Sequence, residues 1–359
     1  TKLHPWLNYK LTLLLKQCAK KGIYLSPLRI LALENYEKLN NEGVPCDLIT
    51  GEEEIINENS THVSCTIEKA NLNEEYDIAV IDEIQMIGDS MRGMAWSRAL
   101  LGLRCKEIHV CGALNTKELL EKILTDCNDD YEINEYTRNT PLEVEYKNFS
   151  YNDTKEGDAI VVFSKKRVLE IAQSYSEKGI KASIIYGDLP PEVRKMQYAE
   201  FLNKETKVLV TTDAIGMGVN LPIRRIIFMS VSKYDGEEVR ELTSQEVKQV
   251  AGRAGRKGIY DVGYVAAVGG TQDLLKEKLE MKDKPIEKAV IGPSDAILKI
   301  KNLPLNQKLA LWKDREESLD YYTKMDISEY LLILERIKKY KLKEVDQWNL
   351  VKVPFDVSR

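Results

Sequence analysis

The chain has little histidine, no long apolar run and no closely paired cysteines, and each shortage argues against a class of protein. Its 359 residues include only three histidines, which argues against histidine-rich metal sites and most histidine-based catalysis. No run approaches the ~20 apolar residues of a membrane span, so no membrane association is expected. The six cysteines form no CxxC pair, which indicates reduced thiols rather than disulfides or zinc ligands.

The charge balance also restricts the function. A formal net charge of −5 gives no general attraction to nucleic acid, so any such binding must use a local basic groove. A chain of 359 residues predicts two or three domains. We expect a bacterial cytoplasmic protein, because no transit-type segment is visible.

Short apolar runs alternate with helical patterns along most of the chain. Such alternation predicts an α/β fold with parallel sheets covered on both faces. The runs are "GIYLSPL", "YDIAVID", "EIHVCG", "DAIVVFS", "KASIIYG", "TKVLVTTD", "RRIIFMSV" and "VGYVAAVGG". Two clear helical patterns are "RILALENYEKLNNEG" and "KKRVLEIAQSYSEKG". A polar stretch predicts a linker near residues 140–157, and strands are expected to stop after about residue 283.

The last segment is predicted to be a helical appendage. The stretch "ISEYLLILERIKKYKLKEV" indicates a helix, because Ile327, Leu331, Leu334 and Ile337 share one face. A capping box of Asp326 and Glu329 would begin it. We therefore expect a first α/β domain over 1–142, a second over 143–282 and a helical C-terminal segment over 283–359.

Polar residues follow several of the predicted strands. Asp82 and Glu83 follow "IAVI", Ser164 and Lys165 follow "IVVF", and Asp213 follows "VLVTT". Ligands of open parallel sheets lie at the carboxyl ends of the strands. These positions are therefore the candidate functional edge of each sheet.

The pair Asp82–Glu83 poses a physical problem, because burying two like charges is costly unless something compensates them. A magnesium ion held by Asp82 would do so. Glu83 would then orient and deprotonate a water that attacks a phosphate. The alternative is an acidic strand end that faces solvent.

The string "QVAGRAGR" is more specific. Arg253 and Arg256 are three residues apart and would share one side of a helical turn, giving a multi-donor grip on phosphate oxygens. Gly252 and Gly255 would leave the backbone open for close approach. The alternative is a solvated basic helix end.

Several loops offer further phosphate contacts. The turn in "VTTDAIGMGVNLP" could aim backbone amides at a phosphate, although it is equally compatible with an ordinary strand-to-helix turn. "YLSPLR", "TGEE" and "SCTIE" present hydroxyls, amides and one arginine at successive loop positions. That set suits a sugar-phosphate backbone bound without base readout, although each string alone is also typical of turns and helix caps.

Taken in order, these strings resemble the motif series of superfamily-two helicases of the DExH type. They are "SPLR", "TGEE", "SCTIE", "DEIQM", "HVCGA", "VFSKK", "YGDLPPE", "TDAIGMGVNLP" and "QVAGRAGR". The chain is similar in particular to the RNA helicase of the mitochondrial degradosome and its bacterial relatives, over roughly residues 11–270. The resemblance implies two RecA-like domains in tandem, ATP with Mg²⁺, and a single strand unwound 3′ to 5′.

The resemblance also implies roles for individual residues. Asp82 would hold magnesium and Glu83 would be the base, while Gln249, Arg253 and Arg256 would face the triphosphate. Asp213, Gly216 and Gly218 would line the ATP side of the second domain. The nucleic-acid backbone would be contacted by eight residues: Pro27, Arg29, Thr50, Gly51, Thr66, Ser164, Lys165 and Thr212.

One required part is missing from the sequence. The implied ATPase needs a GxxxxGK[ST] loop before "SPLR", and the chain has none. A first strand over 10–15 and a next strand from Ile23 leave only residues 16–22 between them, too few for a parallel crossover. Either the phosphate loop is omitted from the chain as given, between Lys10 and Lys16, or the protein is a pseudo-ATPase. The retained carboxylates and arginines favour the first explanation.

Two alternatives remain open. A DNA helicase of replication restart shares a similar arginine string, and a non-hydrolysing nucleic-acid scaffold would suit the missing loop. The resemblance further implies single-stranded RNA as ligand, an exoribonuclease partner and, as an alternative location, the mitochondrial matrix. We expect a monomer.

Overall fold

The computed structural model describes most of the chain after the first twenty residues. The first expected strand, over 10–15, and the site of the expected phosphate loop lie outside the described residues. The described ranges are 21–136, 140–187, 189–216, 221–235, 238–255, 258–315 and 320–353.

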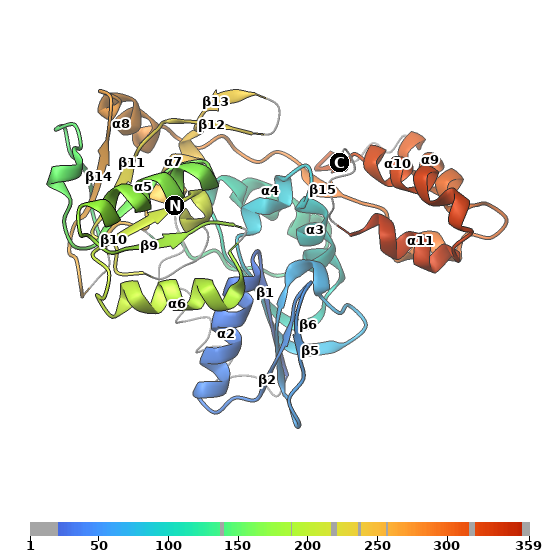
Figure 1. Ribbon diagram of the computed structural model, residues 1–359. Helices are drawn as coiled ribbons and strands as arrows, with labels where there is room; N and C mark the ends of the chain where they lie inside the picture. Colours follow the sequence, from blue (N-terminus) through green and yellow to red (C-terminus); the bar gives the residue numbers. More distant parts are fainter. Residues whose placement is uncertain are drawn as a thin grey trace. The chain divides into compact units, whose positions relative to one another are not determined.

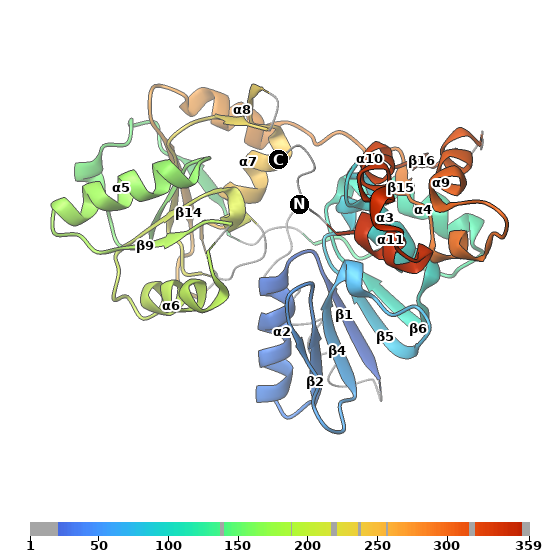
Figure 2. The ribbon, with the colours of Figure 1, turned by 45° about the vertical axis from the view of Figure 1, so that its right-hand side comes forward.

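The first sheet has six strands in the order β3-β2-β4-β1-β5-β6, and only β3 pairs antiparallel among the pairings described. Helix α2 lies along its β2 and β4 strands (Figure 2). The strands are β1 (Gly22–Ser26), β2 (Cys46–Ile49), β3 (Glu54–Ile55), β4 (His62–Thr66), β5 (Glu75–Ile81) and β6 (Arg104–Val110). The helices of this part of the chain are α2 (Arg29–Asn41), α3 (Gly93–Gly102) and α4 (Lys117–Asp126), with short 3-10 turns η1 (Ile67–Lys69), η2 (Ile84–Gly88) and η3 (Leu114–Thr116).

The second sheet also has six strands, in the order β7-β14-β11-β8-β10-β9, and every neighbouring pair is parallel. Its strands are β7 (Leu142–Val144), β8 (Asp158–Val161), β9 (Ala182–Ile185), β10 (Val208–Thr211), β11 (Arg225–Phe228) and β14 (Gly263–Ala267). Its helices are α5 (Lys165–Glu177), α6 (Pro191–Leu202), α7 (Ser244–Ala251) and α8 (Gln272–Glu280) (Figure 1). A hairpin of β12 (Ser232–Tyr234) and β13 (Val239–Glu241) precedes α7, and the 3-10 turns are η4 (Tyr151–Asp153) and η5 (Asp213–Gly216).

Both faces of the second sheet are buried, as the apolar runs predict. Ala159 and Val161 of β8 pack into a cluster with residues of α6, α7 and α8, whereas Ile160 packs with α5 on the other side. Successive strand residues point to opposite faces, so a sheet covered twice needs an unbroken apolar run. The eight runs quoted above all contain strands, which confirms the predicted α/β class.

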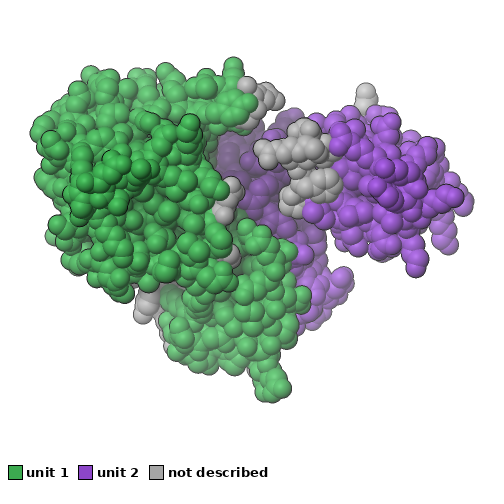
Figure 3. Space-filling view, in the orientation of Figure 1, with its two compact units in different colours: residues 1–19, 26–66, 133–284 green, residues 20–25, 67–132, 285–359 purple. Residues whose placement is uncertain are grey.

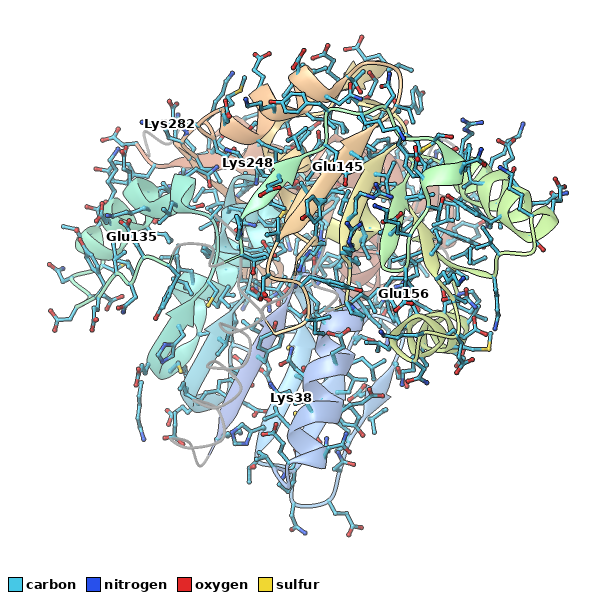
Figure 4. All side chains as sticks on the ribbon, turned by 90° about the vertical axis from the view of Figure 1, so that its left-hand side faces the viewer. Lys38, Glu135, Glu145, Glu156, Lys248 and Lys282 are labelled. Carbon is cyan, nitrogen blue, oxygen red and sulfur yellow. The ribbon has the colours of Figure 1, made fainter. Side chains whose placement is uncertain are left out.

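An ion cluster joins β8 and β11 of this sheet to Glu145, the residue that follows β7. The Arg225 guanidinium donates to both carboxylate oxygens of Asp158, from Nε at 3.0 Å and from Nη2 at 2.6 Å. It also donates from Nη1 to Glu145, labelled in Figure 4, at 2.7 Å. Arg225 and Asp158 are both buried, so each charge is stabilised by the other, and removal of either would leave an uncompensated buried charge.

Four local expectations are wrong. The stretch expected as a linker, 140–157, contains β7, whose pairing with β14 extends the second sheet. Strands do not stop after residue 283, because β15 (Ala289–Ile291) and β16 (Tyr322–Lys324) form a parallel pair. Helix α10 (Ser328–Ile337) covers only the first part of the stretch expected to be one helix, because the chain turns at Lys338–Lys341 before the next helix begins at Glu344. Asp326 accepts hydrogen bonds from the Ser328 amide and hydroxyl instead of forming a capping box.

The C-terminal segment also contains α9 (Leu305–Asp314), α11 (Glu344–Val351) and the 3-10 turns η6 (Asp295–Lys299) and η7 (Lys338–Tyr340). These elements share a small core that includes Leu309, Ile333, Leu334, Trp348 and Val351. The segment is therefore a packed helical element. Over the described ranges, no helix combines the length and apolar character needed to cross a membrane.

By contacts, the chain divides into two compact units, coloured in Figure 3. One comprises residues 1–19, 26–66 and 133–284, and the other comprises residues 20–25, 67–132 and 285–359. The candidate carboxylates lie in the second of these units, and the candidate phosphate-facing residues of α7 lie in the first.

Candidate functional site

Asp82 stands directly after β5 and is almost completely buried, with 1% of its surface exposed. The hydroxyl of Tyr24 donates to its Oδ2 at 2.6 Å, and the backbone amide of Glu83 donates to its Oδ1 at 2.9 Å. Burial and the neighbouring Asp82 charge raise the pKa of Tyr24 well above its usual value. The phenol therefore stays protonated and holds the carboxylate in one orientation.

Glu83 has a left-handed backbone, with φ 51° and ψ 49°. This conformation costs an L-residue about 1–2 kcal/mol and is often found where a site imposes it. Two hydrogen bonds fix the turn: the Ile84 amide donates to the Cys111 carbonyl at 2.8 Å, and the Trp96 indole donates to the Asp82 carbonyl at 2.9 Å. The chain thus reverses sharply after β5 and leaves Glu83 partly exposed beside a buried Asp82.

Gln85 orients the Glu83 side chain. Its amide nitrogen donates to the Glu83 carboxylate, and its amide oxygen accepts from the Ala113 backbone amide at 3.1 Å. Gly112 is needed for this link, because a Cβ there would lie 2.4 Å from the Gln85 oxygen and 2.7 Å from Ile84 Cγ2. The "HVCGA" segment after β6 is thereby tied to the candidate base.

Residues from the turn after β10 and from α7 meet in the other unit. The Arg253 guanidinium donates from Nε to the Gly216 carbonyl at 3.0 Å, and its Nη2 donates to the same oxygen. A Cβ on Gly216 would lie 3.4 Å from Gln249 Cγ, so the turn runs directly along α7. Asp213, at the start of this turn, pairs with Lys233 of β12 at 3.2 Å.

The arginine string lies only partly within the described residues. Helix α7 ends at Ala251, so Arg253 follows the helix, and its expected alignment with Arg256 stays a prediction. Gly255 has φ +76°, and a Cβ on it would lie 2.7 Å from the Gly263 amide. Packing against β14 therefore requires a glycine here. Arg256 and Gly218 lie outside the described residues.

Glu34 of α2 is an ionisable group near Arg253, and no sequence pattern indicated it. Burial raises the pKa of Glu34 to about 7, although the Arg253 charge acts in the opposite direction. One turn along α2, Glu37 forms an ion pair with Lys195 of α6 at 2.6 Å. Arg253 thus lies in the field of a partly buried carboxyl whose charge changes near neutral pH.

Two strand-contact candidates are cations with exposed heads. Arg29, the first residue of α2, forms an ion pair with Glu52, which brings "SPLR" and "TGEE" together. Lys165 starts α5 and lies over the ring of Tyr186 at 5.1 Å. Gly51 is exposed beside Glu52, and Pro27 lies just after β1.

The hydroxyl candidates mostly stabilise turns. Thr50 Oγ1 accepts from the Glu53 amide at 3.0 Å, Ser164 Oγ caps α5, and Thr212 Oγ1 accepts from the Ala214 amide at 3.3 Å. Thr66 is buried at the end of β4. Ser64, Cys65 and Thr66 therefore belong to a strand and not, as expected, to a loop.

Comparison with known proteins agrees with this geometry. The DEXQ-box helicase domain of Suv3 matches residues 9–136, and the helicase conserved C-terminal domain matches residues 115–258. The chain belongs to the superfamily-two helicases. Its two parallel-sheet domains are RecA-like domains in tandem, and the resemblance inferred from the motifs is confirmed.

Relatives of this helicase family member include three mitochondrial proteins. An ATP-dependent RNA helicase SUV3L of Oryza sativa subsp. japonica is 38% identical over 94% of this chain and 48% of the relative. Human SUPV3L1 is 41% identical over 77% of this chain and 37% of the relative. SUV3 of Candida albicans is 41% identical over 78% of this chain and 40% of the relative. The chain spans about half or less of the length of these relatives.

The helicase residues present fit a magnesium ion that takes most of its ligands from a triphosphate and water. Asp82 and Glu83 supply carboxylate oxygens, the type of ligand that Mg²⁺ prefers. Within the described ranges, no group of three or more His, Cys, Asp or Glu side chains could hold a metal ion by itself. Cys111 lies close by, and burial followed by the Asp82 and Glu83 charges raises the pKa of its thiol, which keeps it neutral.

Sequence reasoning missed four residues of the candidate site or beside it: Tyr24, Gln85, Gly112 and Glu34. Gln85 and Gly112 were visible inside the quoted strings "DEIQM" and "HVCGA" but had no assigned role. Tyr24 is 58 positions from Asp82, and no sequence pattern pairs them.

Proposed function

We propose that this chain is the catalytic part of an ATP-dependent RNA helicase that moves 3′ to 5′ along a single strand. The observation that carries the proposal is the carboxylate arrangement after β5. Asp82 is buried and held by two donors, whereas Glu83 is oriented by Gln85 and remains accessible. This division suits one carboxylate for metal binding and one for proton abstraction.

Each half of the chain supplies its own groups. In the first, Asp82 would hold the magnesium ion, and Glu83 would take a proton from the attacking water while Gln85 keeps its carboxylate in place. Bound magnesium would supply charge neutralisation at the phosphates. In the second, Gln249, Arg253 and Arg256 would donate to phosphate oxygens, and Asp213, Gly216 and Gly218 would line the same ligand. Arg253 must first release the Gly216 carbonyl to do so.

The strand would be contacted through its phosphates. Arg29 and Lys165 would supply charge, and backbone amides near Gly51 and at the ends of β1 and β4, beside Pro27 and Thr66, would contact phosphates. The hydroxyls of Thr50, Ser164 and Thr212 each bind a backbone amide nearby and so support the turns in which they lie. We propose weak, salt-sensitive binding that tolerates any sequence.

Substitution of the candidate base tests the proposal. Glu83→Gln should lower the turnover of ATP at least ~10²-fold, because an amide cannot accept the proton, with nucleotide affinity little changed. Glu107→Gln, an exposed glutamate of β6, is the matched control and should behave as wild type. Wild-type turnover in Glu83→Gln would remove Glu83 from the mechanism.

The arginines are tested separately. Arg256→Ala should lower RNA-stimulated hydrolysis by about 10³-fold, as removal of an arginine finger does, and Arg256→Lys should rescue poorly because an ammonium lacks the planar fork. Strand affinity without nucleotide should change little. If hydrolysis and strand binding fall in equal proportion, Arg256 contacts the nucleic acid instead.

A second function, a non-hydrolysing RNA-binding scaffold, is favoured by the missing GxxxxGK[ST] loop. An ATPase assay on the chain as given and on the product of the complete natural gene distinguishes the two. Hydrolysis by the complete product alone would show that the loop is supplied there. Hydrolysis by neither would establish the scaffold.

The remaining assignments are carried over from the sequence analysis. We propose domain limits of 1–142, 143–282 and 283–359, a monomer, and an exoribonuclease as protein partner. The printed names of the relatives favour the mitochondrial matrix over the bacterial cytoplasm. Fractionation of cells that express the complete tagged protein, followed by co-purification and light scattering, tests location, partner and oligomeric state.

A further inference from the structure

The segment between α10 and α11 carries an unusual concentration of positive charge. Residues 336–343, here called the basic turn, contain one arginine and four lysines and no acidic residue, in a chain of net charge −5. The lysines are Lys338, Lys339, Lys341 and Lys343, and all four are exposed. Within the described part of the chain, none of the four forms an ion pair with a carboxylate, so their charge is available to a ligand.

An exposed aromatic ring lies among these charges. Tyr340 is 63% exposed, and the Lys339 ammonium lies 5.0 Å from the centre of its ring. An accessible ring surrounded by cations is the combination that binds single-stranded nucleic acid, because phosphates pair with the cations and a base stacks on the ring.

Two of the lysines occupy positions that helix-end physics disfavours. Lys341 has φ 49° and ψ 41°, a left-handed conformation in which glycine or asparagine is normally preferred. Lys343 is the N-cap of α11 without a side-chain hydrogen bond, where serine, threonine or aspartate would stabilise the helix and a cation opposes the dipole. Both lysines lower the stability of the helix ends at which they lie, and within the described ranges their side chains gain no ion pair in return, which indicates a functional reason for their charge.

The basic turn is presented from a rigid base. Its two flanking helices pack together through Ile333, Leu334, Trp348 and Val351 (Figure 1). The Gln347 side chain also donates to the Leu342 carbonyl at 2.8 Å. A pre-ordered surface loses little conformational entropy when it binds a ligand.

We infer that the basic turn is an additional binding site for single-stranded RNA, at which the four lysines contact phosphates and Tyr340 stacks on a base. This inference rests on the proposed RNA-helicase function and adds a contact outside the two RecA-like sheets. The site would contact only phosphates and the face of a base, so it would bind single-stranded RNA of any sequence.

The test compares two fourfold lysine-to-glutamine variants with the same change in net charge. One variant changes Lys338, Lys339, Lys341 and Lys343. The control changes Lys276, Lys282, Lys284 and Lys288, which are exposed around and after α8. Binding of a fluorescent oligouridylate is measured by anisotropy over a salt series, together with ATP turnover without RNA and thermal unfolding.

The basic-turn variant should lose about tenfold or more in affinity at low salt, and its salt slope should fall by up to about 3, because each lost contact removes about 0.7. The control should keep the wild-type slope, and turnover without RNA should be unchanged in both. Tyr340→Ala should weaken binding by about tenfold, and Tyr340→Phe should restore it, since stacking needs only the ring.

The outcomes separate this inference from the proposed function. If the wild type binds RNA while the basic-turn variant keeps the wild-type affinity and slope, the inference is wrong and the proposed function stands. The same result is expected if the turn binds an acidic protein instead. If the wild type binds no RNA, both are overturned. Equal losses in Tyr340→Ala and Tyr340→Phe would overturn the stacking assignment, even if the lysine variant behaves as a misfolded protein.

Discussion

Replacement of Glu34 by glutamine should stabilise the protein at neutral and alkaline pH. Glu34 lies on α2 close to Arg253, and burial raises its pKa from 4.5 to about 7 despite the attraction of that arginine. In the unfolded chain the carboxyl is hydrated and has its ordinary pKa. The folded protein therefore holds this proton more tightly than the unfolded chain does.

The sign and the size of the effect follow from that difference. Between about pH 4.5 and about pH 7 the folded state binds more protons, so the free energy of unfolding falls as the pH rises through this window. A pKa raised by about 2.5 corresponds to a fall of about 3 kcal/mol at most. Glutamine has nearly the same shape but cannot ionise. Glu34→Gln should therefore match the wild type at low pH and exceed it by up to about 3 kcal/mol above pH 7.

Urea denaturation followed by circular dichroism, from about pH 5 to about pH 8, measures this difference. Glu37→Gln is the matched control on the same helix. Its partner is Lys195 at 2.6 Å and both side chains are about half exposed, so the loss should be below about 1 kcal/mol. Because the Glu37 charge also raises the pKa of Glu34, this variant should keep a slightly weaker form of the wild-type pH dependence. Parallel curves for wild type and Glu34→Gln across the whole range would refute the assignment of a raised pKa.

Three further predictions concern the site and its support. Gln85→Ala should lower ATP turnover by about 10–100-fold with little change in nucleotide affinity, because the candidate base loses its orienting partner; steady-state kinetics with saturating RNA measures this. Gly255→Ala should lower the midpoint of thermal unfolding more than Gly258→Ala, since both have positive φ but only Gly255 has backbone where the Cβ would lie. Arg225→Leu should cost about 3–5 kcal/mol in urea denaturation by leaving Asp158 buried without its cation, and Asp158→Leu in the same chain should recover part of the loss.

The sequence alone determined the fold class and the positions of the carboxylates. Unbroken apolar runs mark strands covered on both faces, and β8, with neighbouring residues in two different clusters, shows why such a run has no polar gap. Asp82 and Glu83 were assigned to a strand end because the apolar run stops there, and β5 ends at Ile81. These features depend on residues that are close in the sequence, so pattern alone reveals them.

Short and irregular elements were not predictable in this way. Strand β7 has three residues in a polar stretch and exists because β14 supplies its hydrogen bonds. The pair β15 and β16 likewise depends on segments about thirty residues apart that have no apolar period of their own. Helix α7 ends at Ala251 with Gly252 as its C-cap, so Arg253 lies outside the helix.

Only the tertiary structure decided which groups act together at the candidate site. Tyr24 binds Asp82, Ala113 binds Gln85, and Arg253 lies near Glu34, in each case across a long stretch of sequence. A hydrogen bond or a pKa change depends on distance and burial in space. The sequence supplies the chemical groups and their local geometry. The partners come within hydrogen-bond distance only when the intervening chain folds.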